Sequence, residues 1–218
     1  MVRVISLFFI LNLPMFAWAD AFVAGKDYRI LDGYNKIETV GNSASVTEFF
    51  SYGCPWCYRL EPALQQWVSK QAENIYFNRV PVVFHMDWKY YAKAYYTINS
   101  LGLSPQVSRD LFKTILVDKK PMNSNQAMID FFVQHGVENS LATSAFENSV
   151  SFDIQLKEDQ GLLVRYKVRG VPSFVVGGEY ITGLDMAKTE ARLFEILDFL
   201  VNKAKKQAPQ KLQSKVMP

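Results

Sequence analysis

The segment Ser51-Tyr52-Gly53-Cys54-Pro55-Trp56-Cys57-Tyr58 contains the only two cysteines of the chain, in a C-x-x-C spacing. The apolar run at 46–50 precedes it and predicts a buried strand, and the pattern from about Pro55 to Lys70 predicts a helix. Cys54 would then lie at a helix N-terminus, where free backbone N–H groups and the positive end of the helix dipole favour a thiolate. A lowered thiol pKa makes such a cysteine both an attacking nucleophile and a good leaving group.

Other uses of the cysteine pair fit the sequence less well. A structural disulfide that closes so small a loop would contribute about 2 kcal/mol by the chain-entropy formula, against about 4.7 kcal/mol for a loop of about 100 residues. A tetrahedral zinc site needs four ligands, and the two histidines, His85 and His135, lie far apart in the sequence. The residue inventory therefore favours redox chemistry.

Two motifs together resemble one known family. Glu48-Phe49-Phe50-Ser51, followed by Cys54-Pro55-x-Cys57, is similar to the DsbA family of periplasmic thiol:disulfide oxidoreductases. Arg169-Gly170-Val171-Pro172-Ser173-Phe174-Val175 resembles the cis-proline loop of that family. The resemblance covers essentially the whole mature chain and implies a thioredoxin-like fold.

The predicted secondary structure fits this fold. A strand, a helix and a strand up to about residue 84 form one βαβ unit, and a hairpin with a two-glycine turn follows at 171–183. Between them the chain predicts four or five helices and no convincing strand. We therefore expect an α/β fold in which a thioredoxin-like domain, residues 20–86 and 168–205, is interrupted by an all-helical insertion domain, residues 87–167.

The two ends of the chain are predicted to lie outside the folded domains. Arg3, the apolar run Val4 to Phe16 and the A-x-A pattern Ala17-Trp18-Ala19 predict a signal peptide, residues 1–19, that is cleaved after Ala19. The alternative is a membrane anchor, but the apolar stretch is shorter than the roughly 20 residues that span a bilayer. Residues 206–218 are polar and basic, which predicts a disordered tail.

The cysteines have distinct predicted roles. We expect Cys54 to be the exposed nucleophile and Cys57, one turn into the helix, to be buried and resolving. Glu48 interrupts the apolar strand, and a buried carboxylate there needs a partner or a proton unless it faces water. The resemblance implies a buried acid beneath the cysteine pair that assists proton movement.

The resemblance also assigns the second motif. It implies that Pro172 follows a cis peptide bond and packs against the C-x-x-C, and that Val171 lines the substrate groove; an ordinary trans proline at a strand start is the alternative. The dipeptide between the cysteines is Pro55-Trp56, whereas the usual DsbA dipeptide is Pro-His. Because tryptophan cannot carry a positive charge, we expect the Cys54 pKa to be lowered less than in a Pro-His relative.

The predicted function is that of a dithiol oxidase. Export places the cysteines where disulfides persist, and the resemblance implies the periplasm of a Gram-negative bacterium, reduced or unfolded exported proteins as substrates, and a quinone-linked membrane reoxidase of the DsbB type. We expect a monomer with no metal and no cofactor, and a net charge of +3 is too weak to indicate nucleic acid. A disulfide isomerase or reductase of the same fold is the first alternative. A non-catalytic module that holds unfolded chains or copper is the second.

Overall fold

The computed structural model describes residues 22–31, 39–147 and 150–213. Within these residues a six-stranded sheet has the order β1-β6-β5-β3-β2, and β4 also pairs with β3. The strands are β1 (Arg29–Ile30), β2 (Thr39–Val40), β3 (Ser43–Phe50), β4 (Ile75–Pro81), β5 (Ser173–Val176) and β6 (Tyr180–Gly183).

Strand β3 is the centre of the sheet. It runs parallel to β4 and antiparallel to β5. Its last residues are apolar on both faces, because Val46 packs in one core cluster and Phe49 in another. A strand covered on both faces loses the simple polar–apolar alternation, which explains the continuous apolar run in the sequence.

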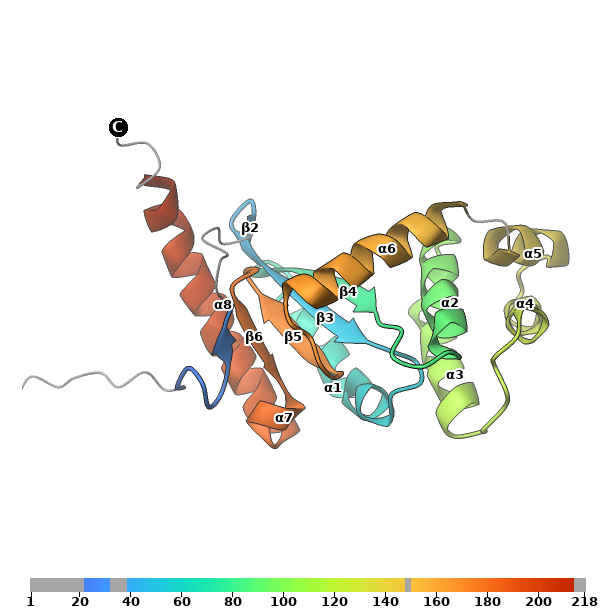
Figure 1. The fold of residues 1–218 in the computed structure, drawn as a ribbon, viewed down its shortest axis with the longest axis horizontal. Helices are drawn as coiled ribbons and strands as arrows, with labels where there is room; N and C mark the ends of the chain where they lie inside the picture. Colours follow the sequence, from blue (N-terminus) through green and yellow to red (C-terminus); the bar gives the residue numbers. More distant parts are fainter. Residues whose placement is uncertain (1–21, 32–38, 148–149, 214–218) are drawn as a thin grey trace, which may run out of the picture.

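Five helices separate β4 from β5 along the chain. Figure 1 shows α2 to α5 gathered beyond one end of the sheet, while α6 runs back across it. This arrangement confirms the predicted fold class, a thioredoxin-like fold with a helical insertion. The helices of the described residues are α1 (Pro55–Lys70), α2 (Trp88–Ser100), α3 (Pro105–Leu116), α4 (Asn125–Gln134), α5 (Asn139–Glu147), α6 (Val150–Arg165), α7 (Leu184–Ala187) and α8 (Glu190–Gln213).

Helices cover both faces of the sheet. Leu64 of α1 and Leu197 of α8 belong to the same buried cluster as Val46. On the other face, Leu163 of α6 is buried in a cluster with Phe49. The last of the five inserted helices therefore packs on the sheet itself, in addition to its contacts with α2.

A further buried cluster joins the helical part to the cysteines. Phe50, Tyr52 and both cysteines share it with Phe112 of α3 and with apolar side chains of α2, α4 and α5. The rings of Tyr52 and Phe112 meet edge to face, with centroids 4.7 Å apart. The cysteine pair thus lies where the sheet and the helical part meet.

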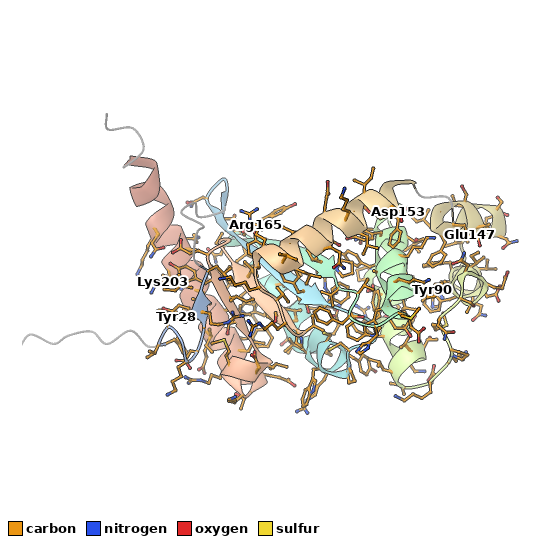
Figure 2. All side chains as sticks on the ribbon, in the orientation of Figure 1. Tyr28, Tyr90, Glu147, Asp153, Arg165 and Lys203 are labelled. Carbon is orange, nitrogen blue, oxygen red and sulfur yellow. The ribbon has the colours of Figure 1, made fainter. Side chains whose placement is uncertain are left out.

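The predicted disordered tail is wrong for its first eight residues. Helix α8 continues through Gln213, and two of its side chains, Lys203 and Gln207, contact tyrosines of the sheet side of the molecule. Lys203 donates to the Tyr28 hydroxyl at 3.1 Å, and Figure 2 shows these two side chains on adjoining elements. The Tyr180 hydroxyl donates to Gln207 at 2.6 Å. These contacts outweigh the weak helical pattern of the sequence.

The predicted signal peptide, residues 1–19, lies outside the described residues. Among the helices that are described, none combines the length and apolar character needed to cross a membrane.

Candidate active site

The C-x-x-C segment connects the end of β3 to the first turn of α1. Cys54 is the N-cap residue, with an extended backbone, and Pro55 occupies the first helical turn. The backbone N–H of Cys57 donates to Cys54 Sγ at 3.2 Å. A sulfur in this position takes the place of the usual oxygen cap and satisfies one of the free N–H groups of the helix. The predicted location of Cys54 at a helix N-terminus is confirmed.

Both cysteines are free thiols and both are buried. Cys57 is fully buried, as predicted, but the expectation that Cys54 is exposed is wrong, since only 4% of it is accessible. The cis-proline loop covers it: the Cys54 thiol donates to the Val171 carbonyl at 3.4 Å. Trp88 and Tyr58 pack against the same cluster. Cys54 remains the more accessible cysteine of the two.

The environment moves the two thiol pKa values in opposite directions. The hydrogen bond from the Cys57 thiol, aided by the backbone N–H groups of Cys57 and Trp56, lowers the pKa of Cys54. Burial, followed by the interaction with Cys54, raises the pKa of Cys57. Of the two cysteines, Cys54 is therefore the one that loses its proton more easily in the reduced protein.

The cis-proline loop reaches the cysteines through strand pairing. The Val171–Pro172 peptide bond is cis, which confirms that expectation. Ser173 begins β5 and lies opposite Phe49 of β3, so the loop before it comes to the end of β3 where the cysteines begin. This pairing explains the contact between Val171 and Cys54 across 117 residues of sequence.

Trp56 is prominent on the surface beside the thiols. It is 56% exposed, and the guanidinium carbon of Arg59 lies 5.4 Å from the centre of its ring. Arg59 also donates to Glu190 at 2.8 Å. Pro55 is exposed next to Trp56. The dipeptide between the cysteines therefore offers an apolar surface with a cation stacked on it.

A buried ion network lies on β3, α1 and β4. Arg79 Nε donates to Glu48 Oε2 at 2.6 Å, and Arg79 Nη2 donates to Glu61 Oε2 at 2.6 Å. Glu48 is fully buried and Glu61 nearly so. One guanidinium thus serves two carboxylates, so that the network carries excess negative charge when both acids are ionised.

The network changes the titration of Glu48. Burial raises the pKa of Glu48 to about 7, although Arg79 opposes the rise. Glu48 Oε1 is buried and has no hydrogen-bond partner among the described residues, which leaves an oxygen able to hold the proton. The charge of Glu48 raises the pKa of both Cys54 and Cys57. The sequence-based expectation of a buried, paired acid is confirmed.

Sequence analysis missed Arg79 and Glu61. Arg79 is the only charged residue of β4, and Glu61 sits beside Leu60 on the buried face of α1. An isolated charge in an apolar strand was the available signal. Its partner follows only from the parallel register, which places Arg79 opposite Glu48.

A groove opens beside the cysteines. It encloses about 1010 Å³, and Trp56, Val171 and Pro172 form its edge nearest Cys54. It extends along the end of β6 to α7 and the start of α8. Within the part of the chain that the structure describes, no group of three or more His, Cys, Asp or Glu side chains is placed to hold a metal ion.

Comparison with known proteins agrees with this geometry. The family model of the DSBA-like thioredoxin domain matches residues 45–194. The thiol:disulfide interchange protein DsbA of Burkholderia cepacia is 36% identical over 178 residues, which make up 82% of this chain and 84% of that protein. The protein of the same name from Pseudomonas aeruginosa is 31% identical over 189 residues, covering 87% of this chain and 89% of the relative.

Solved structures give the same result. The crystal structure of Pseudomonas aeruginosa DsbA superposes with a TM-score of 0.81 at 29% identity and covers 88% of this chain and 98% of that chain. The family match at residues 45–194 includes most of β3, the C-x-x-C helix, the insertion and the cis-proline loop. The chain therefore belongs to the DSBA-like thioredoxin domain family.

Proposed function

We propose that this protein is a dithiol oxidase that donates its Cys54–Cys57 disulfide to reduced, newly exported proteins. The observation that carries the proposal is the place of Cys54 at the N-cap of α1, where the Cys57 N–H donates to its sulfur at 3.2 Å; this environment lowers the pKa of Cys54, whereas burial raises the pKa of Cys57. Stabilising the Cys54 thiolate stabilises the reduced protein, and a stable reduced form makes the disulfide a stronger oxidant.

The reaction proceeds by two thiol–disulfide exchanges. A substrate thiolate attacks Sγ of Cys54, the Cys54–Cys57 bond breaks, and the Cys57 thiolate leaves and takes up a proton. A second substrate thiolate then attacks the substrate sulfur of the mixed disulfide, and Cys54 leaves as a thiolate. Two electrons pass from the substrate to the protein. The substrate gives up two thiol protons and gains one disulfide bond.

Glu48 is suited to assist the proton step. Cys57 is buried, so its thiolate is costly until it is protonated. An acid with a pKa of about 7 exchanges protons readily at neutral pH. We assign Glu48 this positioning and proton-holding role, with Pro55 and Trp56 tuning the Cys54 thiolate.

The proposal also covers the substrate groove, the reoxidising partner, the location of the protein and its domains. Val171 and Pro172 would form the near edge of the substrate groove. A quinone-linked membrane reoxidase of the DsbB type would restore the disulfide. The protein would act as a monomer in the periplasm of a Gram-negative bacterium after cleavage behind Ala19. Residues 20–86 and 168–205 would form the thioredoxin-like domain, and 87–167 the insertion.

A disulfide isomerase or reductase is the second candidate, and Trp56 is the observation that favours it. An uncharged residue at this position leaves the Cys54 thiolate without a neighbouring positive charge from the dipeptide. A weaker thiolate gives a less oxidising disulfide.

The reduction potential of the Cys54–Cys57 pair, measured at equilibrium with glutathione, separates the two candidates. A pair more oxidising than the glutathione pool supports the oxidase. A pair as reducing as thioredoxin would overturn it in favour of the second candidate. The Cys54→Ala variant serves as control, because it removes the exchange and must be inactive in oxidising a reduced test protein.

A further inference from the structure

The groove beside Cys54 has an uneven distribution of charge. Six charged side chains line it, and the cations outnumber the carboxylates by four to two. The near edge, formed by Trp56, Val171 and Pro172, is uncharged. The charged residues of the groove are Arg29, Arg59, Arg169, Lys188, Asp185 and Glu190.

Some of these charges are already engaged. Arg59 forms an ion pair with Glu190 at 2.8 Å. Lys188 donates to the backbone carbonyl of Asp185. These contacts fix the far end of the groove, where α7 meets α8, and neutralise one of the four cations with a carboxylate.

Two guanidinium groups have no carboxylate partner within the described residues. Arg29 donates only to the Lys167 carbonyl, at a long 3.5 Å. Arg169 is exposed, two residues before Val171. Arg29 lies on β1 opposite Ile181 of β6, another residue that lines the groove. Guanidinium groups bind carboxylates through paired N–H donors, so Arg29 and Arg169 offer two sites for acidic side chains.

Arg29 and Arg169 line the same groove as Val171, which contacts the sulfur of Cys54. The Val171 carbonyl contacts Cys54 Sγ at 3.4 Å, and Val171 also lines the groove. A substrate cysteine joined to Cys54 therefore starts at this edge, and the chain on one side of it passes along the groove. Side chains within a few residues of that cysteine come close to Arg169 and Arg29.

We propose that this groove selects reduced substrates with Asp or Glu within a few residues of the reacting cysteine; this inference rests on the proposed function. The partner is an extended, cysteine-containing acidic segment. Its carboxylates pair with Arg29 and Arg169, while apolar side chains lie against Trp56. Arg29 and Arg169 are thereby specificity-determining residues and take no part in the exchange itself.

The choice of acidic substrates has a chemical consequence. A carboxylate near a cysteine raises the pKa of its thiol and so decreases the fraction present as thiolate. Acidic segments are therefore intrinsically slower to attack a disulfide. When such a segment binds, the cations of the groove offset the effect of its carboxylates on the thiol pKa. The protein would therefore oxidise efficiently substrates that small disulfides oxidise slowly.

The test uses two dithiol peptides that differ only in having Glu or Gln on both sides of the first cysteine. The rate of oxidation by the disulfide form of the full chain is measured as kcat/KM and divided by the rate of each peptide with hydroxyethyl disulfide, an uncharged small disulfide, which removes the intrinsic difference in thiol reactivity. The groove variant combines Arg29→Gln and Arg169→Gln in one protein. The control changes the same number of charges away from the groove, at the exposed residues Lys120 and Lys157.

We expect the normalised preference for the Glu peptide to fall about five- to tenfold in the groove variant and to stay unchanged in the control. Added salt should reduce the preference of the unaltered protein, because exposed charges are screened. An equal preference in the unaltered protein and the groove variant, with both peptides oxidised, would overturn the inference and leave the proposed function intact. Failure of the unaltered protein to oxidise either peptide would overturn both.

Discussion

Replacing Glu48 by Gln should change how the stability of the protein depends on pH. Glu48 is fully buried, and burial raises its pKa from 4.5 to about 7. Glutamine has nearly the same shape, and its side-chain oxygen can still accept from Arg79, but it does not titrate. The substitution therefore isolates the contribution of one proton.

The magnitude follows from the two pKa values. They differ by roughly 2.5, and each pKa unit corresponds to about 1.36 kcal/mol, which gives about 3 kcal/mol. Between pH 4.5 and about 7 the folded protein keeps the Glu48 proton that the unfolded chain releases. Stability therefore falls as the pH rises through this range and becomes level above it. The stabilisation by the protonated form is fully present only below the unfolded pKa.

The free energy of unfolding by urea, measured for both proteins with reduced cysteines from about pH 4 to about pH 8.5, tests this reasoning. The stability of the unaltered protein relative to Glu48→Gln should fall by about 3 kcal/mol with rising pH. Burial also raises the pKa of Asp159 to about 7, but that group titrates in both proteins and cancels in the difference. A difference that is flat, or that grows with pH, would refute a raised Glu48 pKa.

Three further substitutions test other parts of the structure. Trp56→His should lower the Cys54 pKa, since imidazolium adds a positive charge; thiolate absorbance against pH measures this, and an unchanged pKa contradicts the argument. Gly53→Ala would place a Cβ 2.4 Å from Trp88 Nε1, so the indole must move and urea unfolding should show a loss of about 1–3 kcal/mol; full stability would mean that Trp88 is not held there. Ser124→Ala removes the N-cap of α4, whose hydroxyl accepts a backbone hydrogen bond at 3.2 Å, and should lower the free energy of unfolding by about 1 kcal/mol. Ser124→Asp should keep the cap, so equal losses in both variants would refute the capping role.

The sequence was informative where local chemistry determines the structure. The helix from about Pro55 to Lys70 and the place of Cys54 at its start followed from the spacing of apolar residues and of the cysteines, and both match α1. The contacts across the sheet could not be predicted from the sequence, because tertiary packing sets the register of the strands. Arg79 faces Glu48 only through the β3–β4 register.

The burial of Cys54 escaped prediction for a related reason. A residue at the end of a strand and the start of a helix is often accessible, and nothing near Cys54 in the sequence indicates otherwise. The cover comes from Val171, whose contact spans 117 residues. Likewise, the hydrogen bonds of Lys203 and Gln207 in α8 are made to Tyr28 and Tyr180, which are far away in the sequence, so the local pattern could not reveal them.

The place of the five helices between β4 and β5 has a consequence for the order of folding. During synthesis, β3 can pair with β4 early, but β5 emerges only after α2 to α6 have been made. Until then one edge of the central strand is open, and an open edge of an apolar strand invites pairing with other chains. Long-range pairing of this kind also slows folding, since a large loop must close first. A chain truncated before Ser173 would leave this edge open permanently and should aggregate more readily than the complete chain.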